Sequence, residues 1–227
     1  MKRIFLFDLD GTITEPKEGI TKCVQYSLEY LGIHEPDLDK LECFIGPPLH
    51  KSYQVYYNLS EEEAFKAVDK YRERYKDIGI FECNLYEGIE EVFKAIKAKG
   101  GIIGLATSKP EEFAVRLLEH YNLSQYFDCI TGSLMDGRRT EKAEVIEEAF
   151  ARMGINNEKK PETIMIGDRL HDILGANKTG IESIGVKYGY SVGNELVEAG
   201  ATYVVETTEE LKALAEKIIE NQSIKGK

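Results

Sequence analysis

The sequence of 227 residues contains no tryptophan, no long hydrophobic run and no excess of basic residues. The apolar run near its start, 4–7, is far shorter than the roughly 20 residues of a membrane-spanning helix, and it is too short for a signal peptide core. Lys plus Arg number 29 against 40 Asp plus Glu, so the formal net charge is −11. This charge argues against nucleic acid or an anionic membrane as the main partner. A small anionic substrate remains compatible, because one metal ion and one lysine reverse the potential locally.

Cysteine is also scarce. The four cysteines are far apart, form no CxxC pair and have no histidine cluster beside them. This spacing argues against a zinc site and favours reduced thiols in a cytoplasmic protein. They are Cys23, Cys43, Cys83 and Cys129.

Short apolar runs alternate with helical patterns through most of the chain. Strands alternating with helices of this length predict an α/β fold, a doubly wound parallel sheet with helices on both faces. The predicted strands are 3–9, 102–106, 127–131, 163–166, 181–186 and 203–205. The predicted helices of this part are 89–99, 111–120, 141–153, 173–178, 194–199 and 209–219.

About 70 residues of helical pattern separate the first strand from the others. They include a helix at 61–75 that Ser60 and Glu63 begin with a capping box. We therefore predict an α/β core formed by 1–14 and 84–227, with an all-helical cap domain, 15–83, inserted over the carboxyl ends of the strands. The tyrosines of the insert have helical spacing, which favours packing in the cap core over stacking on a nucleobase.

Polar residues collect where the predicted parallel strands end. Such ends meet at one edge of a sheet, so we expect these side chains to share one cleft. Several carboxylates placed together repel one another unless a cation lies among them, and an oxygen-only set suits Mg²⁺. The residues are Asp8 and Asp10, Thr107 and Ser108, Asp168 and Asp172, with Lys142 at the start of a helix.

With these motifs in this order, the chain resembles the haloacid dehalogenase-like superfamily of phosphohydrolases. The matching segments are FDLDGT at 7–12, Thr107-Ser108, Lys142, and Gly167-Asp168 with Asp172. Further segments resemble the branch of phosphoglycolate phosphatases and 5′-nucleotidase-like enzymes. They are FIGPPL at 44–49, ATSKP at 106–110, KAEVI at 142–146 and GDRLHD at 167–172.

The resemblance implies a mechanism that the residue types suit. Asp8 would attack phosphorus and form an aspartyl-phosphate. Asp10 would protonate the leaving alkoxide and then activate water. Mg²⁺ would bind a carboxylate oxygen of Asp8, the main-chain carbonyl of Asp10 and the side chain of Asp168.

The remaining motif residues would hold the phosphate. Gly11 would let the backbone approach it, and Thr107 and Ser108 would bind its oxygens, although both could simply cap the next helix. Lys142 would pair with the nucleophile and the phosphoryl group, with Lys109 and Arg139 as alternative cations. Asp172 would orient Lys142 or a metal-bound water. In the cap, Gly46 would contact the substrate, unless 46–48 is only a rigid helix start.

These observations predict a Mg²⁺-dependent phosphomonoesterase acting on a small phosphorylated metabolite. Phosphoglycolate and nucleoside 5′-monophosphates are the leading substrates, and the sequence does not decide between them. A dehalogenase would lack the second acid, Asp10. A phosphomutase would retain both acids. A non-catalytic metabolite-binding module would have no need of all four of Asp8, Asp10, Lys142 and Asp168.

Overall fold

The computed structural model describes residues 3–225, with side chains up to 221. Its contacts divide the chain into two compact units. The α/β unit is Met1–Ile13 with Leu85–Lys227, and the helical unit is Thr14–Asn84.

The α/β unit is built on one sheet of parallel strands. Its order is β5-β4-β1-β6-β7-β8, so β1 lies at the centre and the chain winds outward on both sides of it. The predicted doubly wound parallel sheet is thus confirmed. The strands are β1 (Ile4–Phe7), β4 (Ile102–Pro110), β5 (Cys129–Ser133), β6 (Thr163–Gly167), β7 (Glu182–Val186) and β8 (Tyr203–Val205).

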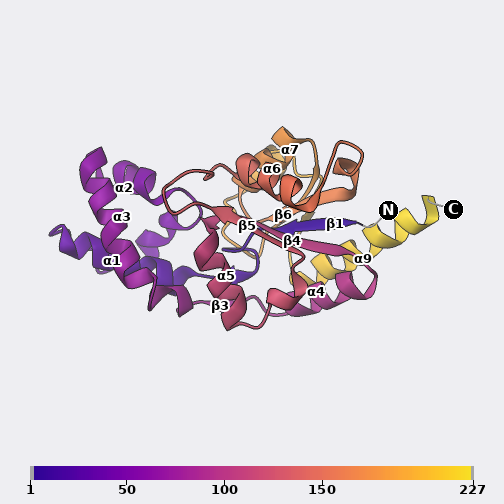
Figure 1. The fold of residues 1–227 in the computed structure, drawn as a ribbon. Helices are drawn as coiled ribbons and strands as arrows, with labels where there is room; N and C mark the ends of the chain where they lie inside the picture. The colour runs from indigo at the N-terminus through magenta and orange to yellow at the C-terminus, as the bar shows by residue number, and fades with distance from the viewer. Residues whose placement is uncertain (1–2, 226–227) are drawn as a thin grey trace. The chain divides into compact units, whose positions relative to one another are not determined.

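Helices cover both faces of this sheet. Figure 1 shows α6 and α7 above it and α4, α5 and α9 below it. Helix α6 connects β5 to β6 and so crosses from one side of β1 to the other. The helices are α4 (Ile89–Ala98), α5 (Glu111–His120), α6 (Lys142–Met153), α7 (Leu170–Thr179), α8 (Glu195–Glu198) and α9 (Thr208–Lys225).

Burial on both faces explains why β1 is apolar throughout. Ile4 and Leu6 belong to the core cluster beneath α6 and α7. On the other face, Phe7 packs edge-to-face against Phe93 of α4, with ring centroids 5.2 Å apart. Each such side chain stabilises the fold by about 1.5–3 kcal/mol relative to exposure. Together they hold the carboxyl end of β1 in place.

Three strands differ by two residues or more from the predicted ranges. β1 ends at Phe7, two residues before the end of the predicted strand 3–9. β4 continues four residues beyond Ala106, to Pro110, through a register shift against β5. β5 begins two residues late, because the turn η3 (Ser124–Tyr126) precedes it. Helix α7 begins at Leu170, three residues before the predicted start, because the Asp172 carboxylate accepts a hydrogen bond from the Arg169 amide and caps the first turn.

The helical unit packs three α-helices and two 3₁₀ turns. Ser60 and Glu63 form the expected capping box: the Ser60 amide donates to Glu63 Oε2 (2.9 Å), and the Glu63 amide donates to Ser60 Oγ (3.3 Å). Of the five tyrosines whose spacing predicts packing in the cap core, Tyr53, Tyr71 and Tyr75 are buried and Tyr57 is half-buried. The prediction is wrong for Tyr56, which is exposed. The elements are β2 (Thr14–Glu15), α1 (Lys17–Tyr30), η1 (Leu38–Phe44), α2 (Leu49–Tyr57), α3 (Glu61–Tyr75), η2 (Gly79–Phe81) and β3 (Asn84–Leu85), with β2 paired to β3.

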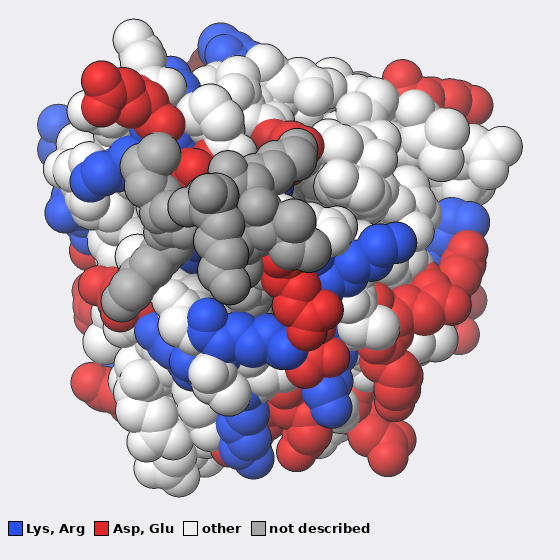
Figure 2. All heavy atoms as spheres, turned by 90° about the vertical axis from the view of Figure 1, so that its right-hand side faces the viewer, with Lys and Arg blue, Asp and Glu red and all other residues white. Residues whose placement is uncertain are grey.

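Two surface properties bear on possible partners. Among the described residues, no helix combines the length and the apolar character needed to cross a membrane. On the face shown in Figure 2, Lys and Arg side chains are interspersed with Asp and Glu, without a continuous basic tract.

Candidate active site

The site is centred on Asp8, the first residue after β1. Its amide donates to the carbonyl of Ile166 in β6 (2.8 Å), which extends the parallel ladder by one residue. The Asp8 side chain is 13% exposed, so it is reachable from solvent at the carboxyl edge of the sheet. This is the edge at which open α/β sheets bind ligands.

Lys142, the first residue of α6, binds Asp8 from the neighbouring element. Its ammonium lies 2.8 Å from Asp8 Oδ1 and 2.8 Å from Asp172 Oδ1, and it donates to the Ala106 carbonyl at 3.0 Å. Burial lowers the pKa of Lys142, but the charges of Asp172 and Asp8 outweigh it and hold the pKa above its usual value. Lys142 is therefore a fixed cation beside the candidate nucleophile.

Asp168 follows β6 and is almost fully buried. Thr12 Oγ1 donates to its Oδ1 (3.2 Å), and the Tyr190 amide donates to its Oδ2 (2.8 Å). Burial, together with the charges of Asp172 and Asp8, raises the pKa of Asp168 well above its usual value. No sequence pattern indicates the role of Tyr190, because its contribution is a main-chain amide, whereas Thr12 already belongs to the FDLDGT motif.

Two glycines make this packing possible. Gly11 has φ = +84°, and a Cβ there would lie 2.1 Å from Asp168 Oδ2. At Gly189, a Cβ would lie 2.2 Å from the Gly11 carbonyl oxygen. The loop after β1 and the loop after β7 therefore meet around Asp168, at a distance that only glycine permits.

Asp172, in the first turn of α7, supports Lys142 from within the protein. One carboxylate oxygen pairs with Lys142 and the other accepts from the Arg169 amide (3.1 Å). Burial raises the pKa of Asp172 to about 6, although the charge of Lys142 opposes this. Both oxygens are engaged, which suits the predicted role of orienting Lys142.

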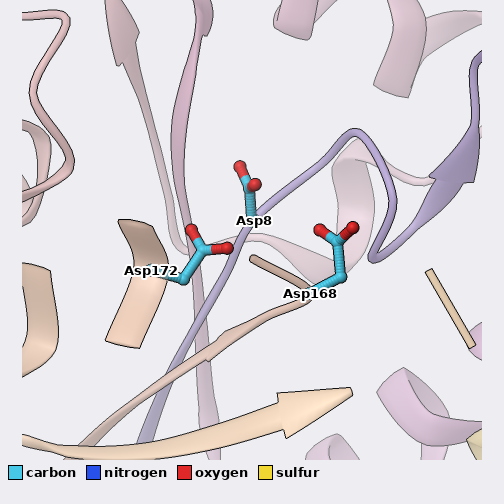
Figure 3. Close-up of side chains that lie close together, drawn as sticks. All are labelled: Asp8, Asp168 and Asp172. Carbon is cyan, nitrogen blue, oxygen red and sulfur yellow. The ribbon is translucent and has the colours of Figure 1, made fainter. Parts of the chain in front are cut away.

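The three carboxylates form a set that fits a divalent cation. Asp8, Asp168 and Asp172 each offer an oxygen within 4.8 Å of the others, and Figure 3 shows Asp168 and Asp172 flanking Asp8. With Lys142, the ionised cluster of three carboxylates and one ammonium carries a formal charge of −2, which one divalent ion neutralises. These candidate ligand atoms are carboxylate oxygens, a type that Mg²⁺ prefers, although both oxygens of Asp172 are already engaged by Lys142 and the Arg169 amide.

Asp10 and Lys109 form a second charged pair. Lys109 Nζ lies 2.9 Å from Asp10 Oδ1 and 2.7 Å from Oδ2. From the sequence alone, Lys109 is only an alternative to Lys142 as the cation of the site. The structure separates the two lysines, since each binds a different aspartate of the FDLDGT motif. Arg139, the other alternative, pairs instead with Glu111 and Glu148.

The remaining predicted residues lie as follows. Thr107 is buried in the carboxyl-terminal half of β4, and its hydroxyl accepts from the Lys109 amide (3.2 Å). Ser108 donates to the Thr140 carbonyl (3.0 Å), two residues before Lys142. Gly46 lies in the helical unit, in the turn before α2, with φ = +103°. Thr107 and Ser108 thus belong to the same sheet edge as Asp8, whereas Gly46 belongs to the other unit.

Comparison with known proteins gives consistent matches. The family model "Haloacid dehalogenase-like hydrolase" matches residues 5–186. A 5′-nucleotidase of Pseudomonas aeruginosa is 45% identical over 191 residues, 84% of this chain and 85% of that protein. The tyrosine-protein kinase PtkA of Mycobacterium tuberculosis is 32% identical over 212 residues, 92% of this chain and 71% of that protein. The crystal structure of a predicted phosphatase from Clostridium acetobutylicum superimposes with a TM-score of 0.89 at 44% identity, covering 97% of this chain and 99% of that one.

Proposed function

The chain belongs to the haloacid dehalogenase-like hydrolase family, and from this we propose that it hydrolyses a small phosphate monoester, most readily a nucleoside 5′-monophosphate. Family membership confirms the resemblance described from the sequence. The observation that carries the proposal is the cluster at the end of β1: Asp8 and Asp172 within 2.8 Å of Lys142, with Asp168 completing an oxygen-lined set.

The proposed reaction has two phosphoryl transfers. Asp8 attacks phosphorus while Asp10 gives a proton to the departing alkoxide, which leaves an aspartyl-phosphate and the alcohol. Water then attacks the same phosphorus, Asp10 takes its proton, and the Asp8 carboxylate is released with inorganic phosphate. Lys142 holds Asp8 in position and balances charge on the phosphoryl oxygens. Thr107 and Ser108 bind those oxygens at the end of β4.

Mg²⁺ is the cofactor that we propose for this site. Asp8, Asp168 and the main-chain carbonyl of Asp10 would hold it, and it would neutralise phosphate charge that otherwise repels the nucleophile. Asp172 is engaged on both oxygens by Lys142 and the Arg169 amide, so we assign it to orienting Lys142. None of the four cysteines forms a disulfide, which agrees with a location in the reducing cytoplasm.

Among the two predicted substrate classes, similarity favours the nucleotide. The 45% identity to a 5′-nucleotidase extends over 84% of this chain. Phosphoglycolate remains the alternative substrate. The helical unit, including Gly46, would act as the cap that contacts the part of the substrate beyond the phosphate, because fold alone does not set specificity.

A different acceptor for the phosphoryl group would give a different activity. A phosphomutase would return it to a sugar, and the relative named as a tyrosine-protein kinase points to a protein hydroxyl as a further acceptor. Both alternatives use the Asp8 nucleophile but release little inorganic phosphate. A non-catalytic binding module would form no phosphoenzyme.

The deciding experiment measures phosphate release from a panel of esters, with Mg²⁺ and with EDTA. The panel contains nucleoside 5′-monophosphates, phosphoglycolate, a hexose phosphate and an aryl phosphate. We expect Mg²⁺-dependent release that is fastest with a nucleotide. Isomerisation of the hexose phosphate without phosphate release would replace the proposal by a phosphomutase. Transfer of the phosphoryl group from one of these esters to an added tyrosine-containing peptide, without phosphate release, would replace it by a tyrosine-directed phosphotransferase. If no ester of the panel releases phosphate in the presence of Mg²⁺, the non-catalytic binding module would be favoured.

A further inference from the structure

An irregularity in β4 turns Lys109 toward the end of β1. The register pairs Ala106 with Thr131 and then Pro110 with Ser133, so four residues of β4 advance beside two of β5. The Lys109 amide donates to Thr107 Oγ1 and stabilises the irregular segment. Bulges at strand ends commonly re-aim a side chain. Here the re-aimed side chain is Lys109, whose ammonium reaches Asp10 in another strand's loop, 99 residues earlier.

The Lys109–Asp10 ion pair is largely buried, and both carboxylate oxygens of Asp10 take part in it. The Lys109 side chain is 5% exposed and that of Asp10 is 18% exposed. Both carboxylate oxygens lie within 2.9 Å of the same nitrogen. Asp10 precedes Gly11, whose positive φ gives this loop a conformation that other residues rarely adopt. An ammonium bound to both oxygens therefore restricts the rotation of the Asp10 carboxylate.

Lys142 does not duplicate this role. An ammonium has three N–H groups, and those of Lys142 face Asp8, Asp172 and the Ala106 carbonyl. The site thus contains two buried cations with separate partners: one for the attacking acid, and one for the acid assigned to proton transfer. A proton-transfer group must lie within about 2.6–3.2 Å of the atom that it serves, so its orientation controls its efficiency.

We propose that Lys109 is a positioning residue that orients the Asp10 carboxylate for its two proton transfers. This inference rests on the proposed function, since it assumes that Asp10 is the acid and base of the reaction. Lys109 acts through Asp10, and neither binds the substrate nor replaces Lys142. Its effect should therefore disappear when Asp10 can no longer transfer protons.

The test compares Lys109→Met, Asp10→Asn and the double variant, each assayed with a nucleoside 5′-monophosphate and with an aryl phosphate. Lys109→Met should lower kcat for the nucleotide by about 10- to 100-fold, within the range that general acid–base help provides, with KM changed by less than about threefold. In rapid-quench experiments with the aryl ester, phosphoenzyme formation should fall less than its hydrolysis, because an aryl leaving group needs little protonation. In the Asp10→Asn background, Lys109→Met should change kcat by less than about twofold.

Two further variants separate positioning from a general structural role. Lys109→Arg retains a cation and should recover most of the lost kcat. Lys97→Met is the matched control. Lys97 pairs with Asp128 near the amino end of β4, where the Asp128 carboxylate also accepts a hydrogen bond from the Ile103 amide. The kcat of Lys97→Met should equal that of the wild type. Thermal unfolding by circular dichroism verifies that each variant is folded, and Lys109→Gln serves as the neutral variant if Lys109→Met does not fold.

The outcomes distinguish this inference from the proposed function. A wild-type protein that releases no phosphate from any ester removes the proposed function. If the wild type is active, the positioning role is overturned when the reductions in kcat caused by Lys109→Met and Asp10→Asn multiply in the double variant. A raised KM with unchanged kcat, or an Arg variant as slow as the Met variant, overturns it as well.

Discussion

The two units of this protein bury different kinds of polar side chain. In the α/β unit, the buried polar residues of the described chain include charged ones, namely two lysines and two aspartates: Lys109, Lys142, Asp168 and Asp172. In the helical unit, the buried polar residues are hydroxyls only: Thr14, Thr21, Ser27 and Ser52. Exposed apolar side chains show the opposite distribution. Of the eleven large apolar side chains that are exposed in the described part of the chain, seven lie in the helical unit: Tyr26, Tyr30, Val55, Tyr56, Phe65, Ile78 and Phe81.

The difference shows where stability has been given up for chemistry. A buried charge costs several kcal/mol unless its partner and hydrogen bonds compensate, and a well-packed apolar residue would often stabilise the same position better. Four such charges at one sheet edge therefore indicate function. The helical unit uses ordinary packing and helix caps. Substitutions at the charged edge of the sheet should mainly lower activity. Substitutions of helix-capping residues in the helical unit should lower stability alone.

The largest effect is expected for Asp8→Asn. The amide keeps the size of the side chain but is not a nucleophile, so turnover should fall by at least roughly 10⁴-fold while the fold is retained. Steady-state phosphate release measures the loss, and mass spectrometry should find no phosphoenzyme. Asp77→Asn makes the same chemical change at an exposed acid of the helical unit and should leave turnover unchanged. Turnover within tenfold of wild type in Asp8→Asn would assign the attack to another group.

The next effect is expected for Lys142→Met, which leaves Asp8 and Asp172 without their shared cation. Removing one partner of a buried pair typically costs about 3–5 kcal/mol. Urea denaturation should show this loss, and kcat should fall by about 10² to 10³. Lys66→Met removes an exposed pair with Glu62 in the helical unit and should cost less than about 1 kcal/mol. Equal losses in the two variants would contradict the contrast between the units.

A smaller effect concerns pH. Burial raises the pKa of Asp172 to about 6 and also raises that of Asp168, so the folded protein holds protons that the unfolded chain releases near pH 4. These groups therefore make the metal-free protein less stable as pH rises from about 4 to about 6. Glu82 has the opposite effect on the pH dependence of stability, because its hydrogen bonds with Arg74 lower its pKa in the folded protein.

The measurement is consequently a difference between wild type and Asp172→Asn. In EDTA, the thermal unfolding midpoints of the wild type and of Asp172→Asn should become more similar as the pH is lowered to 4. As the pH is raised toward 6, the wild type should lose stability relative to the variant. Mg²⁺ should raise the wild-type midpoint more at pH 7 than at pH 4.5, since it favours the ionised carboxylates. A wild-type midpoint that gains on the variant with rising pH would show that Asp172 is ionised well below pH 6.

Much of the fold could be predicted because its signals are local. β1 is apolar at every position, since both of its faces are covered, and α4 shows buried residues at helical spacing: Ile89, Val92, Phe93 and Ile96. The rule that parallel strand ends share one edge was enough to predict that Asp8, Asp168 and Lys142 would lie together. The capping box of α3 was readable because it involves residues only three apart.

What the sequence could not predict depends on register. A strand ending at Ala106 leaves Lys109 in a loop, whereas the irregular continuation of β4 directs it to Asp10. Nothing near Tyr190 in the sequence indicates that its amide binds Asp168, because that contact requires the loop after β7 to lie against the loop after β1. Contacts between distant segments follow from the assembled sheet and have no local pattern.

The smallest effect is expected in the helical unit, for Ser60→Ala. The substitution removes the oxygen that accepts the Glu63 amide at the start of α3, and the loss of such a cap costs about 1 kcal/mol. Ser60→Thr keeps an acceptor and is the matched control. Thermal unfolding should show a lower midpoint for the alanine variant only. With an aryl phosphate, whose small leaving group makes least use of a cap, both variants should keep the wild-type kcat at temperatures where they are folded. A several-fold drop in that kcat for folded Ser60→Ala would mean that α3 influences the charged edge, and the division of chemistry and stability between the units would then be wrong.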